Sequence, residues 1–273
     1  MNLASTPQFA DLLSRAVSEP GVISRAYSAF HDYSVGNQLL ALVQCAERDI
    51  APGPIATFVG WLQKGRCVRR GEKALVLCMP VTLKRHVESQ PGVDDGQPNS
   101  FTRFVLRPKW FVLAQTDGEP VDPPPIPDWD RVRALAALGI TEETFAMTDG
   151  NTLGYARQHT IAVSPLADLP DKTRFHELAH VVLGHTSETG LSTISEVMPR
   201  SLREVEAEAV ALVCLEALGL PGAEFCRGYV QNWNRQRGGE SIPERSAQRI
   251  FKAADQILKA GIEPVPTIGG TND

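Results

Sequence analysis

Residues 176–180 of this chain read His-Glu-Leu-Ala-His, a spacing that can hold a metal ion. Residues four apart on a helix share one face, so the imidazoles of His176 and His180 can reach a single cation. Glu177 would point toward a water molecule beside that cation and take its proton. The motif therefore predicts a hydrolytic centre with one Zn²⁺ per chain, or with another divalent metal. The alternative is a buried helix that carries two incidental histidines.

A hydrolytic zinc site of this kind needs a third protein ligand. The metzincin spacing would require Gly at 183 and His at 186, but the chain has Leu183 and Thr186, which excludes that class. The other solution is a Glu from a following helix, and residues 201–218 form such a predicted helix. Its Glu204 and Glu208 share one face, so one would bind the metal and the other would support a ligand. Helical spacing alone leaves open which does which.

The sequence also predicts the positions of two nearby polar residues and of one strand. Glu206 lies on the opposite side of the 201–218 helix, so we expect it at the protein surface. His185 follows Gly184, a plausible helix end, and a capping or supporting role is preferred over metal binding. Residues 160–164 are the expected edge strand on which a substrate peptide would align.

The motifs H-E-L-A-H and E-V-E-A-E together resemble those of ArdC-type antirestriction proteins and, more distantly, of ImmA/IrrE-type metallopeptidases. Carried over by position, the resemblance implies that Glu204 is the third metal ligand and that Glu208 supports a ligand. The chain lacks the tryptophan-rich start that is frequent in the ArdC type. The other segments that carry the resemblance are residues 33–40, 61–73, 105–115, 229–233 and 247–258.

The resemblance implies an α+β fold with two domains. A small N-terminal domain of helices and a curved sheet, residues 1–117, would bind single-stranded DNA. A proline-rich linker, 118–130, would lead to a zincin-like metallopeptidase domain of the gluzincin type, 131–262, and a disordered tail, 263–273. Such proteins are typically carried by conjugative plasmids and related mobile elements, so the implied function is antirestriction combined with zinc-dependent peptide hydrolysis.

The distribution of charge favours a nucleic-acid partner although the net charge is −5. Between residues 55 and 115, ten basic and four acidic residues give +6, so the rest of the chain carries −11. A positive segment in an acidic chain is the electrostatic footprint of a nucleic-acid-binding face. No base-specific pattern is visible, so we expect weak sequence preference. The residues expected to contact DNA are Lys64, Arg66, Arg69, Arg70, Lys73 and Trp61.

The same segment also has simpler interpretations. A solvated loop is the alternative for the basic cluster, and packing in the core is the alternative for Trp61, Phe104 and Trp110. Short apolar runs at 74–79, 101–106 and 110–114 predict strands, and the polar insert 89–100 has the composition of a hairpin tip.

The sequence also indicates the cellular compartment of the protein. No apolar run reaches the roughly 18 residues that a membrane span needs, and the first residues lack a signal peptide. The five cysteines are odd in number and include no C-x-x-C pair, which favours reduced thiols and a cytoplasmic protein.

Two other functions stay open. The chain could coat single-stranded DNA without proteolysis, with a metal domain that serves structure alone. It could also be a peptidase that cleaves a repressor-like regulator. The sequence specifies neither the protein substrate nor the oligomeric state.

Overall fold

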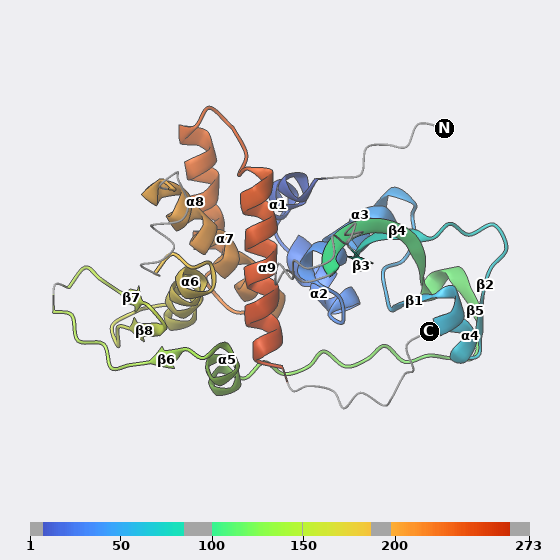
Figure 1. The fold of residues 1–273 in the computed structure, drawn as a ribbon, viewed down its shortest axis with the longest axis horizontal. Coiled ribbons are helices and arrows are strands. Elements are labelled where there is room, and N and C mark those ends of the chain that lie inside the picture. Colours follow the sequence, from blue (N-terminus) through green and yellow to red (C-terminus); the bar gives the residue numbers. More distant parts are fainter. Residues whose placement is uncertain (1–7, 85–99, 149, 187–197, 263–273) are drawn as a thin grey trace, which may run out of the picture. The chain divides into compact units, whose positions relative to one another are not determined.

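The structure is a computed structural model in which helices and small sheets both occur (Figure 1), which confirms the expected α+β class. It describes residues 8–84, 100–148, 150–186 and 198–262. The expected tail at 263–273 and most of the expected hairpin tip at 89–100 therefore lie outside the described residues.

The chain divides into two compact units. Unit 1 comprises residues 1–39 and 125–273, and unit 2 comprises residues 40–124. The N-terminal helices thus group with the C-terminal half, whereas the sequence placed residues 1–117 in one domain. The physical reason is that α1 (Phe9–Ser18) and α2 (Val22–Phe30) pack their apolar faces on C-terminal helices.

The core of unit 1 is built around one long helix, α7 (Arg200–Leu218), which is buried from Val205 to Glu216. Its sequence is apolar on nearly every side, and such a helix must be surrounded by other elements. Helices α2, α6, α8 and α9 supply that cover. The remaining helices of unit 1 are α5 (Arg131–Leu138), α6 (Pro170–Val182), α8 (Ala223–Gln236) and α9 (Glu244–Ala260).

A three-stranded sheet lies beside α6 in unit 1. Its strands are β6 (Thr141–Glu142), β7 (Gly154–Arg157) and β8 (Thr160–Val163), in the order β6-β8-β7. Strand β8 pairs with β6 on one side and with β7 on the other. The expectation that residues 160–164 form the edge strand was therefore wrong, because the short parallel strand β6 occupies the edge that the sequence left free. Among the described residues, β7 is the strand with an unpaired edge near α6.

Unit 2 contains two small sheets. One has the order β1-β4-β3 and the other pairs β2 with β5. Strand β4 runs unbroken through residues 107–109, where the sequence suggested a break, because Pro108 lies at a bulge opposite Val76. The elements are β1 (Ile55–Thr57), α4 (Phe58–Gln63), β2 (Arg66–Val68), β3 (Leu75–Lys84), β4 (Ser100–Val112), η1 (Leu113–Gln115) and β5 (Thr116–Gly118).

Two segments join these units. Helix α3 (Val35–Glu47) contains one boundary, between Leu39 and Leu40. Residues 119–130, most of the expected linker, form no helix or strand. No helix in the described part of the chain has the length and apolarity to cross a membrane.

Candidate functional site

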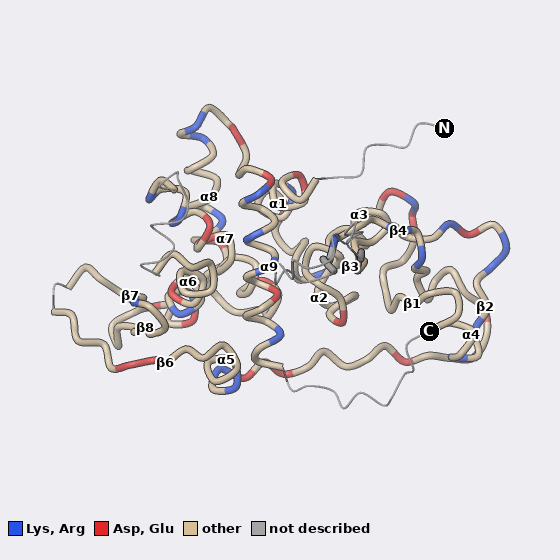
Figure 2. Tube along the Cα trace, viewed as in Figure 1, with Lys and Arg blue, Asp and Glu red and all other residues tan. Residues whose placement is uncertain are grey.

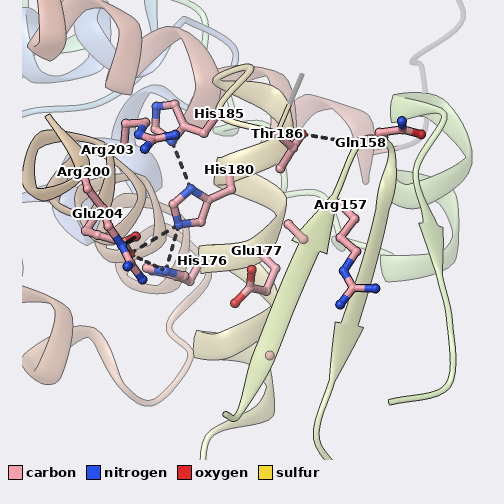
Figure 3. Close-up of a pocket in the computed structure, with 12 residues that line it drawn as sticks. Arg157, Gln158, His176, Glu177, His180, His185, Thr186, Arg200, Arg203 and Glu204 are labelled. Carbon is pink, nitrogen blue, oxygen red and sulfur yellow. Dashed lines mark hydrogen bonds and ion pairs between the residues drawn. The ribbon is translucent and has the colours of Figure 1, made fainter. Parts of the chain in front are cut away.

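Helix α6 places two imidazoles one turn apart on one face. The Nε2 atoms of His176 and His180 lie 3.1 Å apart. Helix α7 packs against α6 and brings Oε2 of Glu204 to 3.5 Å from each of these nitrogens (Figure 3). The structure thus brings together His176, His180 and Glu204, with one donor atom of each within 4.8 Å of the others.

These three donor atoms fit a tetrahedral metal site. Ligands about 2.0–2.1 Å from a zinc ion lie about 3.3 Å apart when the geometry is tetrahedral. The three separations here are 3.1, 3.5 and 3.5 Å. The donor set of two nitrogens and one carboxylate oxygen also suits zinc chemistry. The adjacent imidazoles of His176 and His180 hold the pKa of Glu204 well below its usual range, so this carboxylate stays charged.

Glu208 occupies a different position from Glu204 on the same helix. Its Oε1 accepts a hydrogen bond from Nζ of Lys172 at 3.0 Å and lies 3.7 Å from Nδ1 of His176. It therefore faces the ring nitrogen of His176 that points away from Glu204. Helical spacing could not distinguish the two carboxylates, but the structure does. Glu204 lies at the Nε2 atoms of both histidines, and Glu208 lies near Nδ1 of His176.

Glu177 lies between the histidines and strand β7, as Figure 3 shows. Its carboxyl group is buried, and burial raises its pKa, although the neighbouring charges of His176 and His180 act in the opposite direction. A Cβ at Gly154 would lie 2.5 Å from Cγ2 of Thr173 and 3.0 Å from Oε1 of Glu177. Gly154 therefore leaves the space that Glu177 needs. Sequence reasoning did not identify it, but a glycine inside a strand signals such a close approach.

The turn after α6 brings His185 back onto the site. Gly184 has a left-handed φ of 74°, and the backbone N–H of His185 donates to the carbonyl of His180 at 2.9 Å. As a result, Nδ1 of His185 lies 3.0 Å from Nδ1 of His180. The expected supporting role of His185 is consistent with this geometry.

Glu206 contradicts the sequence expectation, because it is fully buried instead of exposed. Its Oε2 lies 3.1 Å from Nε2 of His185 and 3.3 Å from a guanidinium nitrogen of Arg249. Arg249 also donates to the carbonyl of Leu183 at 2.8 Å. Helix α7 is covered on both sides, so the face opposite Glu204 is not a solvent face. Burial lowers the pKa of His185, which favours a neutral ring.

An open cleft of about 820 Å³ contains this centre. Strand β7 lines one side through Gly154 and Ala156, and the start of α7 lines the other through Arg200 and Arg203. The candidate metal-binding atoms and Glu177 lie between these two sides (Figure 3). The cleft is therefore large enough for an extended polymer segment and places it against the candidate catalytic groups.

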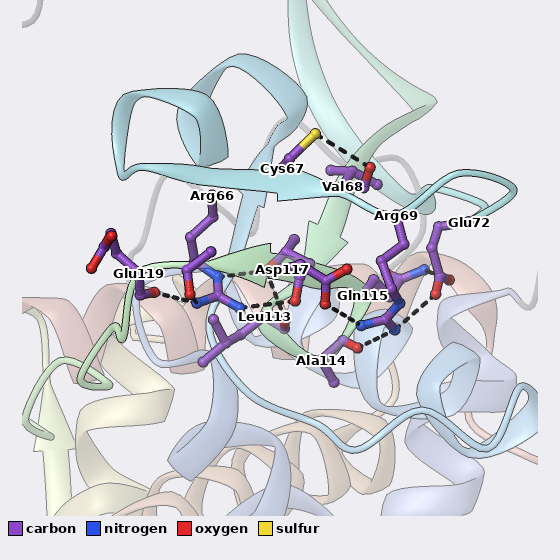
Figure 4. A network of polar contacts seen from close by, with 12 residues as sticks. Arg66, Cys67, Val68, Arg69, Glu72, Leu113, Ala114, Gln115, Asp117 and Glu119 are labelled. Atoms are coloured by element: carbon purple, nitrogen blue, oxygen red, sulfur yellow. Dashed lines mark hydrogen bonds and ion pairs between the residues drawn. The ribbon is translucent and has the colours of Figure 1, made fainter.

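In unit 2, two of the expected DNA-binding arginines are bonded to their own unit. Arg66 donates to the side chain and carbonyl of Thr116 and to the carbonyls of Gly118 and Glu119 (Figure 4). Arg69 donates to Glu72 and to the carbonyl of Ala114. These guanidiniums hold the β2–β5 pair and its neighbouring loop together.

Trp61 was expected to contact DNA, and this expectation was wrong. Its side chain is buried, and its indole N–H donates to the carbonyl of Phe111 at 2.8 Å. Residues 58–63 form a short helix whose inward position is taken by this indole, so it cannot stack on a base. Core packing, the simpler alternative, is what the structure shows.

The other three expected DNA contacts lie at the surface. Lys64, Arg70 and Lys73 are exposed along the segment that runs from α4 into β3, where Figure 2 marks basic positions in blue. Strand β4 adds an aromatic side chain, Phe104, which is 68% exposed, with Arg103 exposed beside it. Unit 2 therefore presents cations and exposed aromatic rings, Phe104 and Phe58 among them, to solvent.

Comparison with known proteins gives one family match in the N-terminal part of the chain and a similar fold over most of its length. Residues 14–109 match the family profile of the N-terminal domain of anti-restriction factor ArdC. The crystal structure of the antirestriction protein ArdC from plasmid R388 in its metal-free form has 21% identity and a TM-score of 0.52. The alignment covers 93% of this chain and 94% of that one. No curated protein gives a significant sequence match.

The Mn(II)-bound structure of the same plasmid R388 protein matches equally well. It has 19% identity and a TM-score of 0.53, and the alignment covers 96% of this chain and 98% of that one. These findings confirm the resemblance to ArdC-type antirestriction proteins, and they show that the whole described fold is of the ArdC type.

Proposed function

Starting from this ArdC-type fold and N-terminal match, we propose that the protein is an antirestriction protein of a mobile element with two activities. Unit 2 binds single-stranded DNA, and unit 1 is a metal-dependent endopeptidase. The observation that carries the second activity is the convergence of His176, His180 and Glu204 beside the buried carboxyl of Glu177.

His176, His180 and Glu204 would hold the metal, and Glu208 would orient His176 through its Nδ1 atom. The spacing of the donor atoms supports Zn²⁺, and the Mn(II)-bound form of the related plasmid protein supports a divalent ion more generally. A divalent metal bound there would supply the Lewis acidity that makes water nucleophilic near neutral pH.

Glu177 is the residue to which we assign proton transfer. It lines the cleft between the three metal-binding residues and strand β7, where the scissile bond would lie. Because burial raises its pKa, its carboxylate accepts a proton from the attacking water more readily than an exposed Glu would. The same proton then passes to the departing amine, so Glu177 returns to its charged form.

For DNA, the supporting features are the exposed cations Lys64, Arg70 and Lys73 together with the exposed ring of Phe104. Lysine and arginine neutralise phosphates, and an aromatic ring stacks on an unpaired base of any identity. We assign no direct DNA contact to Arg66 and Arg69, because their guanidiniums are bonded within unit 2. These two residues support the shape of the surface. The odd number of cysteines and the lack of a C-x-x-C pair support a reducing, cytoplasmic location.

The peptidase proposal is tested with Glu177→Gln in the full-length protein. The variant should retain stoichiometric Zn²⁺ but cleave quenched fluorescent peptides at least about 100-fold more slowly than wild type. Glu240→Gln, at an exposed position outside the cleft, is the matched control and should cleave normally. If metal-loaded wild type cleaves no peptide but binds single-stranded DNA, the protein instead coats DNA without proteolysis.

A further inference from the structure

The two sides of the cleft differ in the residues that they present. Strand β7 presents the small residues Gly154 and Ala156 and ends at Arg157, whose guanidinium lies over the ring of Tyr155, whereas α7 presents Arg200 and Arg203. A site that only held a neutral peptide main chain would not need paired cations. The question is which substrate group these arginines bind.

The open edge of β7 suits an extended peptide. In the β7–β8 hairpin, Ser164 N–H donates to the carbonyl of Leu153 at 2.8 Å, so hydrogen-bonded pairs fall on every second residue from Leu153. Gly154 and Ala156 therefore point their N–H and C=O groups away from β8. Both of these residues line the cleft, so a peptide strand could pair with them across the site.

The arginines have capacity for an anion. The side chain of Arg200 is 86% exposed and approaches Glu204 only to 3.7 Å. Nε of Arg203 is buried and has no hydrogen-bond partner among the described residues, so a donor beside the cleft is free to bind a ligand. Both residues also lie in the first turn of the 19-residue helix α7, whose N-terminal dipole favours negative charge. These features point to a bound carboxylate, which arginine recognises through its planar fork of donors.

A nucleic-acid strand fits the same cleft less well. No Phe, Tyr or Trp is present among the described residues that line it, so bases would have no stacking platform there. The small side chains of β7 and its outward main-chain groups match a peptide instead.

We propose that the cleft takes an extended peptide along β7 and that Arg200 and Arg203 bind a carboxylate of that peptide. This inference rests on the proposed peptidase function and adds its substrate class. The carboxylate can come from an Asp or Glu side chain or from the peptide's own C-terminus, and the two sources are separated by experiment.

The test uses the full-length Glu177→Gln protein loaded with Zn²⁺ and four peptides of one parent sequence, either with Glu or with Gln, and either with a free or with an amidated C-terminus. Fluorescence anisotropy should show about tenfold tighter binding of one carboxylate-bearing form. Adding Arg200→Gln and Arg203→Gln should reduce this preference to about twofold or less. Adding Arg245→Gln, an exposed arginine outside the cleft, should leave it unchanged.

The outcomes distinguish the two proposals. A preference that persists without Arg200 and Arg203, in protein of normal metal content, overturns the carboxylate assignment. It is also overturned if an oligothymidylate displaces the peptide from the cleft and loses its affinity with the same two changes. If the arginine-dependent preference is found but wild type cleaves none of the peptides, the carboxylate site stands and the peptidase function fails.

Discussion

The Nδ1 atoms of His180 and His185 lie 3.0 Å apart, and this contact determines which ring nitrogen of His180 carries the proton. Two ring nitrogens in contact share one proton. Nε2 of His185 faces the buried carboxylate of Glu206, so it must carry a proton, and Nδ1 of a neutral His185 must accept. His180 therefore donates from Nδ1 and directs the lone pair of Nε2 toward His176 and Glu204.

This relay predicts that His185 controls metal affinity without binding the metal. His185→Phe removes the acceptor for His180, and the dissociation constant for Zn²⁺ should rise about 10–100-fold. His185→Gln can accept from His180 and donate to Glu206, so its affinity should stay within a few-fold of wild type. Competition titration against a chelating dye measures both, and equal losses in the two variants would show that the relay does not orient His180.

The buried ion pair of Glu206 should also matter for stability. Glu206→Ala leaves Arg249 without its carboxylate partner, and we expect the free energy of unfolding to fall by about 3 kcal/mol. Glu240→Ala, which removes an exposed carboxylate from its pair with Arg237, should change it by less than about 0.5 kcal/mol. Urea unfolding of metal-free protein compares them, and a loss for Glu206→Ala as small as that for Glu240→Ala would contradict the buried network.

Gly154 should be required for catalysis more than for metal binding. A methyl group there would press on Thr173 and Glu177, and Gly154→Ala should lower kcat/KM about 10–100-fold through misplacement of the carboxylate. Zn²⁺ stoichiometry should be unchanged. Gly228→Ala is the control, since a Cβ there meets nothing within 4 Å. If Gly154→Ala keeps the wild-type kcat/KM, the added methyl group does not displace the carboxylate of Glu177, which would contradict this prediction.

Acid should weaken unit 2 through Glu72. The hydrogen bond from Gln115 and then the contacts with Arg69 lower the pKa of Glu72 below its ordinary value. A carboxylate with a lowered pKa stabilises the fold above its unfolded pKa of about 4.3, and this contribution is lost as pH falls through the folded pKa.

Glu72→Gln should therefore destabilise the protein at pH 7 and make little difference near pH 3. Urea unfolding at the two pH values measures this, with Glu119→Gln, an exposed neighbour in unit 2, as the control. An equal destabilisation by Glu72→Gln at both pH values would contradict the proposed linkage.

The exposed cations of unit 2 should account for the salt dependence of DNA binding. Changing Lys64, Arg70 and Lys73 together to Gln should weaken binding to oligothymidylate and reduce the slope of log K against log salt by about 2. The matched control changes three exposed basic residues of unit 1 to Gln, namely Arg131, Arg245 and Lys252. An unchanged slope in the first triple variant would remove these residues from the DNA-binding surface.

The sequence was sufficient to predict the part of the candidate site whose geometry depends on a single helix. The i, i+4 spacing of His176 and His180 depends only on α6 being a helix, and the structure has that helix. The separation of Glu204 from Glu208 needed the resemblance, because both lie on one face of α7 and only the packing of α6 against α7 places them at opposite ring nitrogens of His176.

The sequence did not predict burial or bonding partners for residues whose neighbours come from distant parts of the chain. Glu206 is acidic and would suit a surface, but α7 is covered on the side it faces. Arg66 belongs to a basic cluster, yet the carbonyls that it binds come from residues about 50 positions later in the chain. Neither partner can be inferred from local composition, since both depend on tertiary contacts.

The proposed metallopeptidase site requires that Glu204, and not Glu208, is the third metal ligand. Metal analysis of purified wild type, Glu204→Ala and Glu208→Ala, after dialysis against limiting Zn²⁺, tests this choice. We predict one Zn²⁺ per chain in wild type, almost none in Glu204→Ala, and retained but weaker binding in Glu208→Ala, because Glu208 acts through His176. Full zinc occupancy in Glu204→Ala would contradict the metal centre on which the peptidase proposal rests.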